Sequence, residues 1–205
     1  MDARPEITPP APRWEWRTFA PSLAELRAKL PNLSDVQPKR SRETYVVCEA
    51  SEHNAKIRFD VLDVKQLFET DSDGLELWKP VFKESFPIAS SAIVRLFGIW
   101  RLKAPVLARE AYTLPQFLDE VVRKTRGLHA VEVEKTRFGF IYAGCIAEMA
   151  QVTFNGIPLE TFCVEHEDRS LIQRARFALG LRSAVNVNYP QAIKETIGTA
   201  ALPAA

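Results

Sequence analysis

Hydrophobic and polar residues alternate in several short segments of the chain, which is the pattern of strands with one buried face. Turn-forming residues separate these segments, with DSDG at 71–74, Gly144, and Asn155-Gly156 as the clearest signals. The alternation predicts strands at 13–19, 43–50, 54–59, 61–70, 129–144, 145–156 and 159–168.

Apolar residues three and four positions apart are typical of helices that bury one face. This spacing predicts helices at 22–30, 169–181 and 188–198, and two or three within 75–125, where prolines interrupt the pattern. In the first of these, Ser22 and Glu25 have the spacing of a capping box. Strand-rich and helical parts follow one another in blocks, which predicts an antiparallel α+β fold rather than alternating β-α-β units.

The composition adds limits to this picture. The chain has 205 residues, of which 46% are hydrophobic, so one sizeable core can form. Its net charge of +1 argues against general affinity for nucleic acid or a membrane, so any anion site must come from local clustering. We expect a disordered, proline-containing lead at 1–12, a single domain at 13–198 with the helical segment 75–125, and a flexible tail at 199–205.

The cellular location is inferred from two features. No segment has the apolar length of a secretory signal or a membrane span, since the longest apolar stretch is interrupted by Arg95. Cys48, Cys145 and Cys163 are odd in number and form no CxxC motif. We therefore expect a cytoplasmic protein with reduced thiols, in which each cysteine acts as a small buried hydrophobe.

Pairs of like charges, two residues apart, stand on three of the predicted strands. Residues i and i+2 of a strand point to the same face, so each pair places two like charges on one surface. Such neighbours repel, and a ligand of opposite charge would stabilise them: phosphates for basic pairs, Mg²⁺ or Mn²⁺ for carboxylates. The alternative is a half-buried sheet whose charges are solvated or form cross-strand ion pairs. The pairs are Lys56 with Arg58, Lys135 with Arg137, and Glu165 with Glu167.

In their order along the chain, these charged strands resemble the CYTH superfamily, also called the triphosphate tunnel metalloenzymes. The family opens with an ExExK strand, and RWEWR at 13–17 stands in that place. Two basic KxR strands, a lysine strand, an acidic ExD strand and an ExE strand follow in the family. Here they are matched by Lys56-Ile57-Arg58, Lys65, Lys135-Thr136-Arg137, Glu148 in part, and Glu165-His166-Glu167.

The resemblance implies an α+β fold, an antiparallel eight-stranded β tunnel or barrel with flanking helices. Members of the family hydrolyse inorganic triphosphate, thiamine triphosphate or RNA 5′-triphosphate, or cyclise ATP, with a divalent metal. Glu165 and Lys135 would be the catalytic residues. The phosphate-binding residues would be Arg17, Lys56, Arg58, Lys65, Lys135 and Arg137, and the Mg²⁺ or Mn²⁺ ligands Glu15, Glu148, Glu165 and Glu167.

Three residues depart from the family pattern. Arg13 replaces the first acid of ExExK, Arg17 replaces its lysine, and Ala150 stands where an aspartate would fall. Two functional hypotheses follow. One is a metal-dependent phosphohydrolase of a triphosphate-bearing small molecule, and the other is a non-catalytic domain that binds polyphosphate or nucleotide or docks a partner. The segment 75–125 could form a lid, a partner site or the face of a homodimer.

Overall fold

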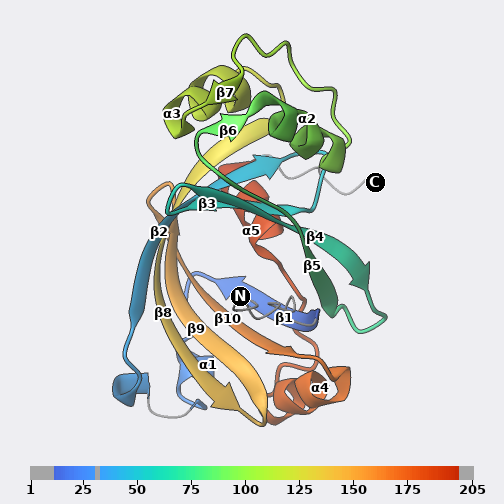
Figure 1. Cartoon of the computed structure of the whole chain (residues 1–205). Coiled ribbons are helices and arrows are strands. Elements are labelled where there is room, and N and C mark those ends of the chain that lie inside the picture. The colour runs from blue at the N-terminus through green and yellow to red at the C-terminus, as the bar shows by residue number, and fades with distance from the viewer. Residues whose placement is uncertain (1–11, 31–32, 199–205) are drawn as a thin grey trace, which may run out of the picture.

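The structure is a computed structural model that describes residues 12–30 and 33–198 (Figure 1). Its longer strands are β1 (Arg13–Ala20), β2 (Lys39–Cys48), β3 (Asn54–Arg58), β4 (Val61–Thr70), β5 (Glu76–Ser85), β8 (Leu128–Tyr142), β9 (Cys145–Phe154) and β10 (Ile157–His166). Its helices are α1 (Ala24–Arg27), α2 (Ser90–Ile99), α3 (Leu114–Gln116), α4 (Arg169–Ala178) and α5 (Tyr189–Ile197). Short elements are η1 (Leu33–Asp35), the π-helical turn η2 (Phe117–Val122), and the paired β6 (Ile88–Ala89) and β7 (Ala111–Tyr112).

The eight longer strands close into a barrel in the order β1-β10-β9-β8-β2-β3-β4-β5. Every neighbouring pair is antiparallel, including the closing pair of β1 with β5. The predicted α+β fold with an antiparallel eight-stranded barrel is therefore confirmed. Turn residues Ala143, Gly144, Asn155 and Gly156 have positive φ values, as the predicted hairpins at these positions require.

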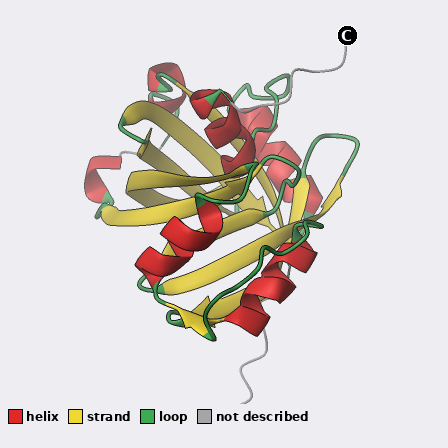
Figure 2. Ribbon diagram, turned by 90° about the horizontal axis from the view of Figure 1, so that it is seen from above, coloured by secondary structure: helices red, strands yellow, loops and turns green. Residues whose placement is uncertain are grey.

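Helices cover two parts of the outer surface of the barrel, as Figures 1 and 2 show. On one part, Phe97 of α2 and Phe117 of η2 belong to a buried cluster with outward-facing residues of β2 to β5. On the other, Ile172 of α4 packs in a second cluster with Trp16 of β1 and Met149 of β9. These outer clusters hold much of the hydrophobic core, so the inner face is free to carry polar residues.

Helix α5 packs against the inner face of the barrel. Its residues Tyr189, Ala192 and Ile193 form a buried cluster with inward-facing residues such as Tyr45 of β2 and Val131 of β8. The helix begins with a capping box at Asn188 and ends at Gly198, whose φ is 74°. Aromatic and aliphatic side chains therefore fill one part of the interior, and the charged side chains occupy the rest.

Residues 76–85 are a strand, which corrects the prediction of a helix at the start of the segment 75–125. Buried residues in this region, Leu75, Trp78 and Phe82, are three and four positions apart and imitate a helical pattern. The alternation of β5 is interrupted at one of two register shifts in its pairing with β4, because Val64 pairs with Phe82 but Lys65 pairs with Pro80, which leaves Val81 as an extra residue. The two later helical predictions in the segment are confirmed by α2 and by α3 with η2.

The predicted capping box at Ser22 and Glu25 is wrong. Helix α1 spans only Ala24–Arg27, and its N-cap is Leu23, with no side-chain cap. The backbone N–H of Leu23 instead donates to the Glu160 carboxylate at 2.6 Å, which fixes the start of the helix one residue later. Predictions for residues 1–11 and 199–205 lie outside the described residues. Among the residues that the structure describes, no helix has the length and apolar character needed to cross a membrane.

Candidate functional site

Cross-strand register shows which predicted residues share the interior of the barrel, because directly paired residues point to the same face. Glu15 pairs with Glu165, and Arg17 pairs with Cys163, which in turn pairs with Glu148. Tyr45, whose ring packs against α5, pairs with Lys56 and marks this face as the inner one. All predicted phosphate-binding residues lie on it: Arg17, Lys56, Arg58, Lys65, Lys135 and Arg137.

Lys135 is the most enclosed lysine of the predicted set. Its Nζ lies 3.1 Å from Oε2 of Glu43, donates to the Tyr45 hydroxyl at 2.8 Å, and lies 4.0 Å from the ring centre of Tyr189. Burial lowers the pKa of Lys135 to about 8, although Glu43 opposes this effect. The amine is therefore a cation at neutral pH that loses its proton on mild alkalinisation.

Glu43 is a charged group that the sequence analysis missed. Its side chain is only 1% exposed, and Oε1 lies 3.6 Å from Nη1 of Arg58 and accepts a hydrogen bond from Ser41 at 3.2 Å. Burial opposes ionisation, but Lys135, Lys56 and Arg58 hold the pKa of Glu43 below its ordinary value. Glu43 is thus a resident anion within the basic cluster.

Arg17 joins the basic cluster to the acidic one. Its guanidinium donates to Oε1 of Glu15 at 2.7 Å and to the Thr161 hydroxyl at 3.3 Å, and it lies over the ring of Tyr189. The nitrogen that donates to Thr161, Nη1, also lies 3.9 Å from Oε1 of Glu148. The second carboxylate oxygen of Glu148 lies 3.9 Å from Arg137, so this acid bridges the two arginines.

Glu15 and Glu165 face each other on neighbouring strands, with Cys163 beside them. A carboxylate oxygen of each glutamate and the Cys163 sulfur all lie within 4.8 Å of one another. Burial and the charge of Glu15 raise the pKa of Glu165. Burial also acts to raise the pKa of Glu15, but Arg17, Lys65 and Lys56 together lower it below its ordinary value. Among the described residues no ion pair is made by Glu165. Because the two carboxylates repel and the donors lie close together, the cluster fits a divalent cation.

Three further positions of the family pattern add no carboxylate to this cluster. Glu167 is exposed and follows the end of β10, where Asp168 caps α4. Arg13, the replacement for the first family acid, is on the inner parity but exposed, opposite Trp78. Ala150 is buried between Arg137 and Thr161, so the missing aspartate would have faced the interior. Of the four predicted acids, Glu15, Glu165 and the neighbouring Glu148 therefore lie together, and the buried Glu76 of β5 pairs with Glu15 on its other side.

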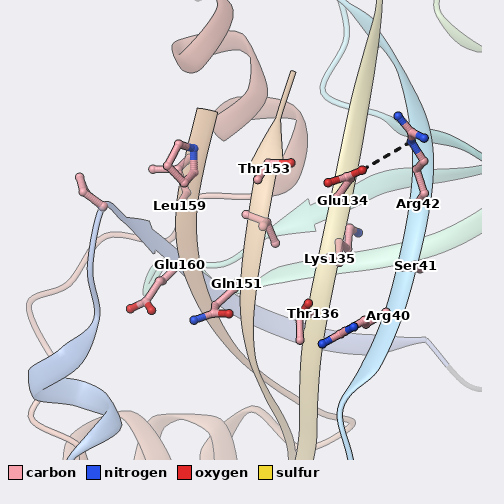
Figure 3. A pocket seen from close by; sticks show the side chains of 13 residues that line it. Arg40, Ser41, Arg42, Glu134, Lys135, Thr136, Gln151, Thr153, Leu159 and Glu160 are labelled. Atoms are coloured by element: carbon pink, nitrogen blue, oxygen red, sulfur yellow. Dashed lines mark ion pairs between the residues drawn. The ribbon is translucent and has the colours of Figure 1, made fainter. Parts of the chain in front are cut away.

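Two pockets clarify where a small molecule has access. A cavity of about 160 Å³ is lined by Lys56, Arg58, Asp63 and Lys83, on the inner face of β3 to β5. A larger hollow of about 760 Å³ lies on the outer face of β2, β8, β9 and β10 (Figure 3). Its side chains form two outward rows across the sheet, Arg40, Thr136, Gln151 and Glu160, then Arg42, Glu134, Thr153 and Pro158. The basic interior and the larger hollow therefore lie on opposite faces of the sheet.

No model of a known protein family matches the chain, and no curated protein matches it. Several solved structures do match the chain. A candidate adenylate cyclase from Bacillus halodurans is 13% identical with a TM-score of 0.47, over 88% of this chain and 95% of that one. A candidate adenylyl cyclase from Hippeastrum, reported with a dominant triphosphatase activity, is 13% identical with a TM-score of 0.47, over 93% and 98%. A conserved hypothetical protein from Pyrococcus furiosus is 15% identical with a TM-score of 0.44, over 87% and 98%.

At these identities the comparisons concern overall shape, and the fold assignment depends on the strand pairing of this chain itself. The pairing gives a closed barrel, and the register places both predicted basic pairs inside it. The chain therefore has the architecture that the sequence resemblance implies, a closed eight-stranded antiparallel barrel with charged residues on its inner face.

Proposed function

We propose that this protein is a divalent-metal-dependent phosphohydrolase that acts on a triphosphate-bearing substrate inside the barrel. The substrate would be inorganic triphosphate or a small organic triphosphate. One observation carries the proposal: the six predicted basic side chains and the acidic donors share a single inward-facing surface. A phosphate chain needs cations along its length, and hydrolysis needs carboxylates near one end of it.

The basic residues would bind the phosphates. The arginines, Arg17, Arg58 and Arg137, offer planar pairs of donors, and the lysines offer point charges. Four of these cations are paired with Glu43, Glu15 or Glu148 in the structure, namely Arg17, Arg58, Lys135 and Arg137. A phosphate chain would replace these carboxylates as the partner of the cations, and the low polarity of the interior would strengthen each contact.

The acidic residues would hold the metal. Glu15 and Glu165 would be its ligands, with Glu148 beside them, and the predicted role of Glu167 stays a prediction because that residue is exposed. When bound, Mg²⁺ or Mn²⁺ would offset the negative charge of the phosphate oxygens and activate a water molecule. Lys135, held by Glu43 and the Tyr45 hydroxyl, would keep its ammonium hydrogens directed at a phosphoryl oxygen.

Phosphate release from tripolyphosphate with Mg²⁺ or Mn²⁺ tests the proposal. The variant Glu165→Gln keeps the shape of the side chain and removes its charge, so turnover should be lost while the thermal unfolding midpoint stays near that of the wild type. Glu134→Gln changes an exposed glutamate on the outward face of β8 in the same way, so it is the matched control and should retain activity. Unchanged turnover in Glu165→Gln would contradict the proposed role.

A non-catalytic binder of polyphosphate or nucleotide is the second candidate. Arg13 and Ala150 replace two family acids, and Arg17 is already a cation bound to Glu15. Such a protein would be stabilised by tripolyphosphate without any metal and would release no phosphate. Steady release of phosphate from the purified chain would exclude it.

A further inference from the structure

Cys163 differs from the other two cysteines in what surrounds it. Cys48 and Cys145 lie in the hydrophobic clusters on the outer surface of the barrel, as a small buried hydrophobe would. Cys163 is only 2% exposed but faces the interior, where its sulfur lies within 4.8 Å of carboxylate oxygens of Glu15 and Glu165. The predicted role of a small buried hydrophobe therefore explains the positions of Cys48 and Cys145 but not that of Cys163.

The Cys163 thiol has no partner among the described residues, since no hydrogen bond or ion pair there reaches its sulfur. The side chain is nevertheless almost completely buried beside two carboxylates. Glu165 likewise makes no ion pair there, and the hydrogen bond from Arg17 to Glu15 uses Oε1 of that carboxylate. Three donors therefore lie close together: the buried Cys163 thiol, the unpaired Glu165 carboxylate, and the Glu15 carboxylate, whose Oε2 takes no part in that hydrogen bond.

The chemistry of these three donors differs from that of an all-oxygen site. Mg²⁺ requires hard oxygen ligands, whereas thiolate sulfur favours Zn²⁺ and similar softer divalent ions. Two carboxylates and one thiolate are three protein ligands, the number that catalytic zinc sites combine with an open position for water or substrate. Two glutamates alone would accept either kind of cation, whereas the addition of a thiolate favours Zn²⁺ and similar ions over Mg²⁺.

We propose that Cys163 is a ligand of the cation held by Glu15 and Glu165, and that the site prefers Zn²⁺-like ions to Mg²⁺. This inference deepens the proposed function, because it concerns the metal at the same acidic cluster. Coordination forms one metal–sulfur bond, and the thiol proton leaves to solvent. Arg17 remains beside the cluster, where it is available to a phosphate oxygen once a cation takes part of the Glu15 charge.

A cobalt titration of the metal-stripped protein tests the proposal directly, because Co²⁺ bound to a thiolate absorbs by sulfur-to-metal charge transfer. We expect the wild type and the control Cys145→Ser to show this band and to release protons as Co²⁺ binds. Cys163→Ser should lose the band. Its Zn²⁺ affinity should fall by about 10-fold or more, while its Mn²⁺ affinity stays within about 3-fold, since oxygen ligands remain.

The outcomes separate this inference from the proposed function. Co²⁺ binding without a charge-transfer band in the wild type, or an equal band in Cys163→Ser, would overturn the role of Cys163. Phosphate release with Mn²⁺ in the same samples would then still support the proposed hydrolase function. A charge-transfer band without any phosphate release would overturn only the hydrolase function. Absence of cation binding would overturn both. If Cys163→Ser does not fold, X-ray absorption of the zinc-loaded wild type decides, because a Zn–S distance of about 2.3 Å is required.

Discussion

Replacement of Glu43 by glutamine is the sharpest test of how the interior is held together. The glutamine keeps the volume of the side chain and its acceptor for Ser41, but it removes the carboxylate charge that lies 3.1 Å from Lys135 and 3.6 Å from Arg58. Removal of one partner from a buried ion pair costs about 3–5 kcal/mol, because the other charge stays buried without compensation. In a chain of this size that loss lowers the unfolding midpoint by about 6–20 °C.

The same substitution should strengthen anion binding. Glu43 occupies the basic cluster that we assign to phosphates, so the wild type must separate its carboxylate from Lys135 before an anion takes its place. In Glu43→Gln this competition is absent, and the affinity for tripolyphosphate should rise by about tenfold, which corresponds to about 1.4 kcal/mol. Stabilisation of the variant by tripolyphosphate should therefore exceed that of the wild type.

Thermal unfolding with and without tripolyphosphate measures both effects. Glu134→Gln is the matched control: Glu134 lies on the outward face of β8, next to Lys135 in sequence, and its exposed carboxylate lies 3.6 Å from Arg42. An exposed pair of this kind contributes about 0–1 kcal/mol, so the control should behave like the wild type. If Glu43→Gln has wild-type stability and no larger response to the anion, Glu43 does not neutralise the cluster and the reasoning fails.

Three further predictions concern Lys135, Tyr189 and Arg176. Tripolyphosphate affinity should fall as the pH rises through about 8, where free Lys135 loses its proton, and calorimetry should show no such step in Lys135→Met. Without anion, the free energy of unfolding should instead rise with pH between about 8 and 10.5. In this range the unfolded chain keeps a proton that Lys135 of the folded chain has lost, and urea titrations should show a gain of up to about 3 kcal/mol. Among the described residues, the buried Tyr189 hydroxyl has no hydrogen-bond partner, so Tyr189→Phe should change the free energy of unfolding by less than about 0.5 kcal/mol. Tyr189→Ala removes the packed ring and should lower that free energy by about 3–5 kcal/mol. Equal losses in the two variants would contradict the packing role of the ring. Arg176 is buried and donates to the carbonyls of Leu181 and Ala184, so Arg176→Met should cost about 1–3 kcal/mol in urea unfolding; no loss would mean that those carbonyls find water instead.

Residue parity was enough to find much of the charged interior from the sequence. Lys56 with Arg58 and Lys135 with Arg137 were predicted to share a face, and the register confirms that both pairs point inward. Parity works here because each pair lies on one uninterrupted strand. The strand β5 was missed for the converse reason, since a register shift in its pairing with β4 makes Val81 an extra residue and interrupts the alternation that identifies a strand.

Groups whose role depends on the strand opposite could not be found in this way. Glu43 becomes the partner of Lys135 only because β2 pairs with β8, and nothing local to its sequence indicates that pairing. The same holds for Cys163, which faces Glu15 and Glu165 only because β10 pairs with β1. Tyr189 was predicted on a helix, but its contact with Lys135 requires that the helix enter the barrel.

The pairing of β1 with β10 also has a consequence for how the chain reaches its native state. Glu15 and Glu165 are direct neighbours in the sheet although about 150 residues separate them in sequence. Contacts of such long range form only after a large loop has closed, so we expect folding to be slow for the size of the chain. Until β10 is in place, β1 and β9 each present an open edge that can pair with another molecule. The acidic cluster lies across the junction of β1 with β10, and a cation bound there would hold together the two strands of the barrel that are farthest apart in the sequence.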